Sequence, residues 1–447
     1  MRTRFPYRLA ALGLVLLAAG ATLAGEGALG SRDYDDYESP RACASCHVDI
    51  YQQWTQAMMS QAYTHHWDEI EYFELAVKHA EADPEFDPVQ KGCNGCHAPL
   101  AYLAGDVPPP RPEAGSRANE SVSCDICHTI TGREGDSSFN FNWISEPGRV
   151  KYGNKEGLDS PHHETRLSEF LQTGEFCGTC HNEQNPYGMM VKSTQLEWAE
   201  GPYAAEGVPC HRCHMPRAES RSAKMAAVDM VSQHLFHGAH DPGKVGGSVE
   251  LRMHPTEREL LYDGTVELKV QLFNAKAGHK IPTGSVEDRI VWLHVTATDS
   301  EGKTWHLPVD PKGFAGEHWT IASDELAYQD LGVPLGDPDF AGLPRDGVPV
   351  GDRIFRKAYL DPEGRMTIMQ WYTASFGPDY RIGPRETKVE TFTWPLPEDV
   401  ALGEVTFEAV LNYKRLVQPV AEFLEVPADE YETIVINSAS TWVEVYD

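Results

Sequence analysis

The sequence has little positive charge and, after its first 24 residues, no long hydrophobic run. Lys and Arg number 38 in 447 residues against 67 Asp and Glu, which gives a formal net charge of −29. A phosphate backbone needs a basic protein face, so this balance argues against nucleic acid as a partner. A membrane-spanning helix needs about 20 apolar residues, and no stretch after residue 24 supplies them. We therefore expect no membrane span in the mature chain.

The single apolar run opens the chain. Arg2, Arg4 and Arg8 precede a hydrophobic stretch over residues 9–24, and small residues precede Gly25. A basic start, a short apolar segment and a small-residue cleavage site are typical of a secretory signal peptide; an uncleaved anchor is the alternative. No cysteine precedes position 43, so we do not expect a lipoprotein. We predict a signal peptide over residues 1–24 and an exported protein, in the periplasm or at the outer cell surface.

Cysteine is absent outside one repeated pattern. All 10 cysteines lie in Cys-x-x-Cys pairs, and a histidine follows each pair directly. The five motifs are formed by Cys43, Cys46 and His47; Cys93, Cys96 and His97; Cys124, Cys127 and His128; Cys177, Cys180 and His181; and Cys210, Cys213 and His214.

This pattern is the attachment motif of c-type haem. Each thiol adds to one vinyl group of the haem, and the adjacent histidine binds the iron as proximal ligand. A structural zinc site does not require histidine after every pair. A disulfide framework would not put every cysteine into one spacing, and a thioredoxin-like dithiol explains only one pair. The sequence therefore predicts five covalently attached c-type haems.

The spacing of the motifs suggests how the haems are grouped. The first cysteines stand at positions 43, 93, 124, 177 and 210, so long and short intervals alternate. A short repeat supports this grouping, because Glu-x-Val-x-Cys ends at both Cys124 and Cys210. We expect haem 2 to pair with haem 3 and haem 4 with haem 5, with haem 1 in front. So little chain per haem predicts a domain of helices and loops wrapped around its cofactors.

The histidines outside the motifs are candidates for the second axial ligand of low-spin haem, a role that methionine can also fill. Three lie after the fifth motif or in a later loop, one lies in a turn between motifs 3 and 4, and one lies on the apolar face of a helix predicted over residues 66–80. In order of preference these candidates are His234, His240, His279, His163 and His66. We interpret five further histidines as structural, namely His79, His254, His294, His306 and His318.

Residues 40–255 resemble the multihaem cytochrome c family that includes hydroxylamine oxidoreductase and its tetrahaem electron-accepting cytochrome. The first motif with Tyr51 and Trp54 behind it is similar to the opening of that family, and Trp198 before the fifth motif is similar to its closing haem site. Residues 232–238 resemble a late segment with a distal ligand. The His279 loop resembles one in members with an added β-domain. The resemblance indicates a family rather than a reaction.

One position departs from the family pattern. The family has histidine five residues after the tryptophan of its opening motif, and this sequence has Met59 there, beside Met58. Met59 is then an axial ligand of a haem with a raised potential, or His65 or His66 replaces it. A third interpretation is that both methionines pack against a haem face.

The second half of the chain contains no cysteine and changes its pattern. Apolar and polar residues alternate over 265–273, 289–298, 387–394 and 405–413, which predicts β-strands. We predict an all-β, immunoglobulin-like sandwich over residues 256–447, after a mainly α or irregular haem domain over 25–255. Residues 312–353, rich in Gly, Asp and Pro, predict a long loop over the haem domain. The β-domain either caps the haems and supplies His279, or offers a surface to a partner or substrate.

Three functions are compatible with these features. The first is electron transfer between redox partner proteins, such as other cytochromes, that the acidic surface attracts by their basic faces. The second is a multihaem oxidoreductase that acts on a small nitrogen or sulfur compound at one haem without a distal ligand. All five motifs end in histidine, so the lysine-ligated haem of the nitrite-reducing relatives is missing. The third is a subunit of an extracellular cytochrome filament. The sequence leaves the oligomeric state open.

Overall fold

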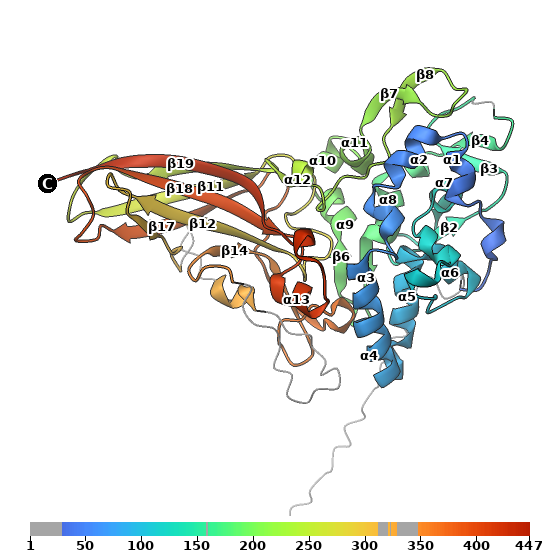
Figure 1. The fold of residues 1–447 in the computed structure, drawn as a ribbon, viewed down its shortest axis with the longest axis horizontal. Helices are drawn as coiled ribbons and strands as arrows, with labels where there is room; N and C mark the ends of the chain where they lie inside the picture. Colours follow the sequence, from blue (N-terminus) through green and yellow to red (C-terminus); the bar gives the residue numbers. More distant parts are fainter. Residues whose placement is uncertain (1–28, 158–159, 312–320, 322, 329–346) are drawn as a thin grey trace, which may run out of the picture.

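A computed structural model describes residues 29–157, 160–311, 321, 323–328 and 347–447 of the chain. The predicted signal peptide lies outside these residues, as does most of the loop predicted over 312–353. The described chain forms two lobes, an N-terminal lobe up to about residue 245 and an elongated β lobe that follows it (Figure 1). Within the described residues, no helix combines the length and the apolar character that crossing a membrane requires.

The N-terminal lobe consists of short helices and two-stranded hairpins, which agrees with the predicted wrapping. Its α-helices are α1 (Pro40–Ala44), α2 (Val48–Trp54), α3 (His66–Ile70), α4 (Val77–Ala82), α5 (Asp87–His97), α6 (Pro99–Ala104), α7 (Cys124–Thr129), α8 (Gly174–His181), α9 (Thr194–Ala199), α10 (Pro202–Ala205), α11 (Cys210–His214) and α12 (Pro242–Val245). Its strand pairs are β1 (Ile130–Arg133) with β2 (Trp143–Ser145), β3 (Val150–Gly153) with β4 (Glu164–Leu167), β5 (Asn182–Gln184) with β6 (Met190–Ser193), and β7 (Arg217–Arg221) with β8 (Val228–Ser232).

Each haem-attachment motif lies on or directly after one of these helices. The first begins in α1 with Cys43 and continues beyond its end, the second and fourth end α5 and α8, the third begins α7, and the fifth forms α11. α5, with 11 residues, is the longest of these. Isolated helices shorter than about 12–15 residues are marginal in water. The motif helices therefore depend on what they pack against rather than on their own propensity.

The helix predicted over residues 66–80 is present and is irregular. α3, a π-helical segment over Glu71–Ala76 and α4 follow one another without a break, and Asp83 caps the end before Pro84. The buried side chains are Trp67, Tyr72, Leu75, Ala76 and His79. A π-helical turn has a wider hydrogen-bond spacing than an α-helix and shifts which side chains face inward. For this reason the buried face differs from the stripe of Ile70, Phe73 and Val77 that a regular period predicts.

The β lobe contains two main sheets within the described residues. The strands β17 (Thr387–Pro395), β11 (Thr265–Asn274) and β9 (Val249–Pro255) form an antiparallel sheet in this order. The second sheet has the order β10 (Glu259–Leu261), β19 (Ile434–Tyr446), β18 (Gly403–Lys414), β12 (Ile290–Thr298) and β13 (Thr304–His306), and β14 (Arg353–Phe355) also pairs with β12. Outside these sheets lie the pair β15 (Lys357–Leu360) with β16 (Ser375–Asp379), and α13 (Gln418–Phe423).

The two main sheets face each other across one apolar core. Alternating residues of β11, including Leu268 and Val270, pack with Leu293 of β12 and with Phe407 and Leu411 of β18. All five side chains are at most 1% exposed. The four predicted strands are confirmed, and the region is a β-rich domain of several sheets. The immunoglobulin-like strand order stays a prediction.

The boundary between the lobes lies slightly earlier than residue 256. β9 pairs along its length with β11, from Val249 opposite Asn274 to Pro255 opposite Leu268. Hydrogen bonds of this kind make β9 part of the β lobe.

The two lobes also share a core. Trp67, Tyr72 and Leu75 of the N-terminal lobe belong to one buried apolar cluster with Trp292 and Trp371 of the β lobe. In this cluster the indole of Trp371 donates a hydrogen bond to Nδ1 of His79 at 3.0 Å. His79, which we interpreted as structural, therefore lies in the contact between the lobes.

Candidate haem-binding site

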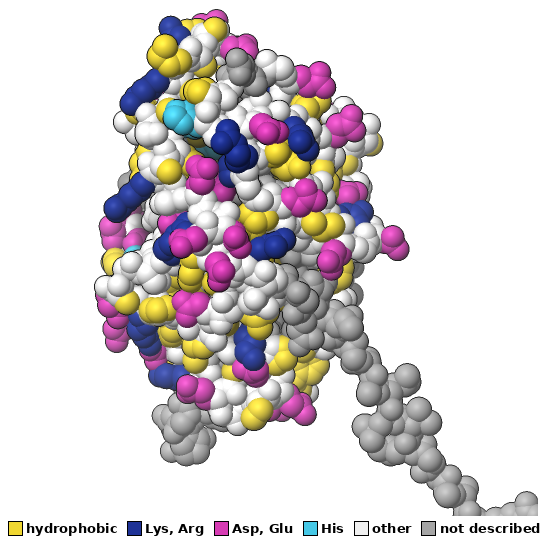
Figure 2. Space-filling view, turned by 90° about the vertical axis from the view of Figure 1, so that its right-hand side faces the viewer, with side chains coloured by type: hydrophobic (Ala, Val, Ile, Leu, Met, Phe, Trp, Pro, Cys, Tyr) yellow, Lys and Arg dark blue, Asp and Glu magenta, His cyan; other side chains and the backbone are white. Residues whose placement is uncertain are grey.

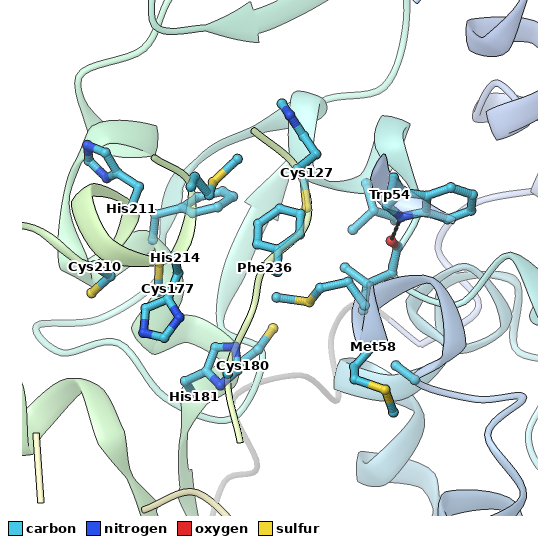
Figure 3. A pocket seen from close by; sticks show the side chains of 18 of the residues that line it. Trp54, Met58, Cys127, Cys177, Cys180, His181, Cys210, His211, His214 and Phe236 are labelled. Atoms are coloured by element: carbon cyan, nitrogen blue, oxygen red, sulfur yellow. Dashed lines mark hydrogen bonds between the residues drawn. The ribbon is translucent and has the colours of Figure 1, made fainter. Parts of the chain in front are cut away.

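One continuous cavity of about 1650 Å³ runs through the N-terminal lobe. All ten cysteines and the histidine of each of the five motifs line this cavity. Figure 3 shows part of it, where the Cys177, Cys180 and His181 side chains of α8 lie beside Cys210 and His214 of α11. Five motifs spread over 172 residues of sequence, from Cys43 to His214, thus meet in one cavity.

Cysteines of different motifs lie near one another in this cavity and indicate which motifs are neighbours. The neighbouring side chains are Cys43 and Cys124, Cys96 and Cys180, and Cys177 and Cys210. Motif 1 therefore lies beside motif 3, motif 2 beside motif 4, and motif 4 beside motif 5. Motifs 4 and 5 are neighbours in the structure, as the sequence predicts.

The predicted grouping of motif 2 with motif 3 is different in the structure. Motif 3 is attached to motif 1 instead, where the indole Nε1 of Trp54 donates to the carbonyl of Val122 at 3.0 Å (Figure 3). Trp54 ends α2, directly behind motif 1, and Val122 leads into α7, which carries motif 3. The short interval between two motifs in sequence does not determine which helices pack together.

Backbone carbonyl groups hold most of the proximal histidines in one orientation. Nδ1 of the ring lies 2.5–2.8 Å from a carbonyl oxygen in four motifs: His47 to Ser222, His97 to Ala62, His128 to Tyr152 and His214 to His237. An Nδ1–H that donates to a carbonyl leaves Nε2 as the free ligand atom, the usual arrangement behind a metal-bound histidine.

Burial keeps several of these rings neutral, as metal ligation requires. Burial lowers the pKa of His128 and of His181. It lowers the pKa of His214 to about 4. His128, His181 and His214 thus have the protonation state that iron binding needs. Four of the five motif histidines have the fixed tautomer as well.

Three proximal histidines face a second histidine ring at a distance that suits one shared metal ion. The ring centres lie 6.1 Å apart for His47 and His163, 6.3 Å for His128 and His234, and 6.3 Å for His214 and His279. Metal–imidazole bonds are about 2.0–2.1 Å long, so two rings that bind one ion from opposite sides have centres about 6 Å apart. The donor set and spacing of these three pairs therefore fit haem iron with two axial histidines.

The three opposing histidines are also held by carbonyl groups. Nδ1 lies 2.9 Å from the Ser232 oxygen in His234, 2.9 Å from the Lys280 oxygen in His279, and 3.3 Å from the Glu164 oxygen in His163. Burial lowers the pKa of His234 to about 4 and lowers that of His279. In the opposing rings, as in most of the proximal ones, Nδ1 therefore lies against a backbone carbonyl oxygen.

His279 reaches the cavity from the β lobe, on the loop between β11 and β12. The Asn274 side chain at the end of β11 donates to the His279 carbonyl at 3.0 Å and accepts from the Ala277 amide at 3.0 Å. Glu197 of α9 accepts from the Lys280 amide at 3.2 Å and from the Thr283 hydroxyl at 2.8 Å. Both lobes therefore position this ring.

A buried ion-pair network also holds the loop that carries His279. Glu197 and Arg381 are each at most 8% exposed and are joined at 2.6 Å, and Arg381 also binds Asp379 at 2.9 Å. Burial disfavours the charge of Arg381, but its hydrogen bond to Asp379 and the charge of Glu197 raise its pKa overall. The charged residues of this network carry no motif, so sequence reasoning missed them.

The remaining proximal residues, His97 and His181, have no such facing histidine ring among the described residues. His240 lines the cavity, and its ring lies 5.7 Å from Trp67 and 6.0 Å from His65. Burial lowers the pKa of His240 to about 3. Met59 also lines the cavity, as does its neighbour Met58.

His66 lies outside the cavity lining. Its Nε2 is 3.1 Å from the Glu430 carboxylate, which Nε2 of His65 also approaches at 2.9 Å. The irregular helix explains this position, because the π-helical segment turns the face of α3 and α4 that looks inward. His66 therefore lies beside Glu430 and not in the cavity that the motifs line.

Charged side chains gather beside the two unpaired motif histidines. Asp68, Glu183, Lys192 and Arg289 line this part of the cavity. Burial raises the pKa of Asp68 and of Glu183, and it raises that of nearby Glu71 to about 8. Lys192 is paired with Glu287 and donates to the Ser285 hydroxyl at 3.0 Å. These residues come from separate elements and share no sequence spacing, so the sequence did not predict that they line one site.

Comparison with known proteins agrees with a haem-binding N-terminal lobe. A family model described as cytochrome c554 and c-prime matches residues 42–129. The penta-heme cytochrome c552 from Thermochromatium tepidum has a similar structure, with a TM-score of 0.62 and 18% identity over 92% of this chain and 100% of that one. The chain has the fold of a multihaem cytochrome c. The motif set of this chain and the matched family model support covalently bound c-type haem.

Other solved structures match only part of this chain. A CARDB domain from Pyrococcus furiosus gives a TM-score of 0.17 at 11% identity, over 44% of this chain and 87% of that one. The sporulation control protein Spo0M from Bacillus subtilis gives 0.18 at 13% identity, over 45% and 50% of the two chains. No curated protein matches the sequence. The finer resemblance to hydroxylamine oxidoreductase stays a prediction.

Proposed function

We propose that this protein is an exported pentahaem c-type cytochrome that transfers electrons between redox partner proteins. The observation that carries the proposal is the single cavity lined by all ten motif cysteines and all five motif histidines. Cysteines of neighbouring motifs lie near one another in it, which supports cofactors close enough for electrons to pass from one to the next. The β lobe then acts as a cap that supplies His279.

Each group of residues has a distinct role in this proposal. Haem supplies reversible uptake and release of one electron. The ten cysteines attach the haems, and the five motif histidines are proximal ligands. His163, His234 and His279 are the opposing ligands in motifs 1, 3 and 5. For motifs 2 and 4 the candidates are His240 and Met59, both of which line the cavity.

The surface supports partners recognised by charge, although not through one uniform patch. The formal charge of −29 favours basic partner faces, such as those of other cytochromes. On the face of the N-terminal lobe in Figure 2, acidic side chains lie scattered among basic and apolar ones. Partner binding that weakens as salt is added would support this steering.

The haem count is tested by intact mass and by a pyridine haemochrome assay on the secreted protein. We expect five haems per chain and a reductive titration that takes up five electrons. The variant with Cys210→Ser and Cys213→Ser is expected to lose one haem and one electron. A wild-type count below five contradicts the proposal. Fusion of residues 1–30 to a reporter enzyme tests export separately.

A second candidate function has one specific observation in its favour. His97 and His181 lack a facing histidine among the described residues, and Asp68, Glu183, Lys192 and Arg289 line the cavity beside them. Such side chains can orient a small polar molecule and hold or move its protons. This arrangement supports a multihaem oxidoreductase for a small nitrogen or sulfur compound.

Carbon monoxide distinguishes the two functions, because it binds only where the protein leaves the sixth position open or weakly held. An unchanged spectrum of the reduced protein supports electron transfer alone. A change equal to one or two of five haems favours the oxidoreductase. Assays with nitrite, hydroxylamine and sulfur oxyanions then follow.

A further inference from the structure

Two histidines and one carboxylate of the β lobe meet far along the chain from the haem motifs. Nδ1 of His294 lies 3.0 Å from both carboxylate oxygens of Asp352, and Nε2 of His306 lies 2.6 Å from one of them. The two imidazole rings are stacked, with centres 5.0 Å apart and planes inclined by 10°. The nitrogen and oxygen atoms of the three residues all lie within 4.8 Å of one another.

The sheet brings these residues together at a break in one of its edges. β13 pairs with residues 296–298 of β12, and β14 pairs with residues 291–293 on the same strand. His294 lies between the two paired segments, where β13 ends at His306 and Asp352 immediately precedes β14. The three side chains thus meet where one partner strand of β12 replaces the other.

A glycine allows this close approach. Gly351 has a φ of +96°, and a Cβ atom there would lie 2.7 Å from Cβ of Pro308. A side chain at this position would therefore push the segment before β14 away from the one after β13. The absence of a side chain lets Asp352 reach His306.

The carboxylate is deeply buried while the two rings are not. The Asp352 side chain is 0% exposed, whereas the side chains of His294 and His306 are each 31% exposed. Across the described part of the chain, Asp352 has no Lys or Arg within ion-pair distance. Burial of a carboxylate is costly unless positive charge lies beside it. At Asp352 that charge comes from the two histidines when they are protonated, or from a bound metal ion.

We propose that His294, His306 and Asp352 bind a divalent transition-metal ion of the zinc class, with a solvent-facing position left open. Two imidazole nitrogens and one carboxylate oxygen form a donor set that such ions prefer. An ion with bonds of about 2.1 Å sets its ligand atoms about 3.0–3.4 Å apart, so the observed 2.6–3.0 Å spacing needs only a small outward shift. Three protein ligands leave a fourth position for water or a small anion.

The simpler alternative is that both histidines only donate hydrogen bonds to the buried carboxylate. The two possibilities differ in a measurable way, because only the first requires a bound ion. The site is independent of the proposed electron-transfer function, since none of its three residues lines the haem cavity.

The experiment uses the haem-loaded protein, freed of loose metal with a chelator and then titrated with Zn²⁺ by equilibrium dialysis. We expect His294→Ala and His306→Gln to weaken one binding event by about 100-fold or more, because each removes a ligand. His254→Ala is the matched control, since His254 is an exposed histidine of the same lobe. X-ray absorption at the zinc edge, which is separate from that of haem iron, is expected to report two imidazoles and further oxygen ligands.

Haem spectra and circular dichroism of each variant check that it folds. The proposal is overturned if the wild type binds no Zn²⁺ at 100-fold molar excess. It is equally overturned if His294→Ala and His306→Gln bind as the wild type does. A loss of binding that His254→Ala shares would indicate nonspecific surface binding and would also reject the site.

Discussion

The two lobes of this protein bury apolar surface in opposite ways. The β lobe packs two sheets against each other, and side chains such as Leu293 and Phe407 are 0% exposed. The N-terminal lobe instead surrounds a cavity of about 1650 Å³ with short helices that carry the haem motifs. One lobe is organised by its own apolar side chains, and the other is organised around its cofactors.

The two lobes are also joined by buried contacts. Trp371 of the β lobe lies in one apolar cluster with Trp67 of the N-terminal lobe, and Glu197 and Arg381 form a buried ion pair between the lobes. His279 crosses from the β lobe into the haem cavity. The β lobe therefore completes the haem-binding site of the N-terminal lobe.

The sharpest test of the comparison is to withhold haem. Chain produced without haem attachment is expected to keep a folded β lobe and to lose the fold of the N-terminal lobe, because helices of this length are marginal alone. Hydrogen exchange should then show protection in β11, β12 and β18 and almost none in α5, α8 and α11. Equal protection in both lobes would show that the N-terminal lobe has a sufficient core without haem.

The next largest effect is expected at the ion pair between the lobes. Arg381→Met leaves the Glu197 carboxylate buried without its cation, which typically costs about 3–5 kcal/mol. Denaturant unfolding of the haem-loaded protein measures this loss. Arg252→Met, at an exposed side chain of β9, is the control, and we expect it to change stability little. A loss of under about 1 kcal/mol for Arg381→Met would mean that the apolar cluster alone joins the lobes.

A substitution at His279 tests whether the β lobe supplies a haem ligand. His279→Ala is expected to open one of the haem sites and to add a carbon monoxide response of about one haem in five, while the haem count stays unchanged. His254→Ala serves as the control. An unchanged carbon monoxide response would reject His279 as a ligand.

The smallest expected effect concerns acid. Although burial opposes its charge, hydrogen bonding and the charge of Arg381 hold the pKa of Asp379 below its ordinary value of 3.8. The stabilisation is therefore complete above about pH 4 and is lost as pH falls further through the lowered pKa. The Asp379 side chain is 25% exposed, so we expect about 1 kcal/mol. Asp379→Asn should remove this part of the acid dependence, measured as unfolding free energy between pH 2 and 6.

Several features were predictable because their chemistry or period is local. The spacing of cysteine and histidine within each motif indicates haem attachment, since both thiols and the adjacent ring must reach one porphyrin. Strict alternation identified the strands that became β11, β12, β17 and β18. His163, His234 and His279 were selected from many histidines, and the structure brings each opposite a motif histidine.

Other features depend on contacts between distant residues. The π-helical segment over Glu71–Ala76 changes the inward face of its helix, so a regular period misplaced His66. The pairing of motif 1 with motif 3 rests on Trp54 and Val122, which no spacing connects. His294 and His306, interpreted as structural, acquire Asp352 as a third partner only where β13 gives way to β14.

The sequence by itself determined the cofactor class, the attachment residues and the alternation of the main strands, because each depends on neighbours a few residues apart. Only the tertiary structure decided which motifs are adjacent, which histidine faces which, and how Glu197 and Arg381 fix the loop of His279. These are contacts between segments far apart in the chain. Packing and burial determine these contacts, and neither can be predicted from the spacing of nearby residues.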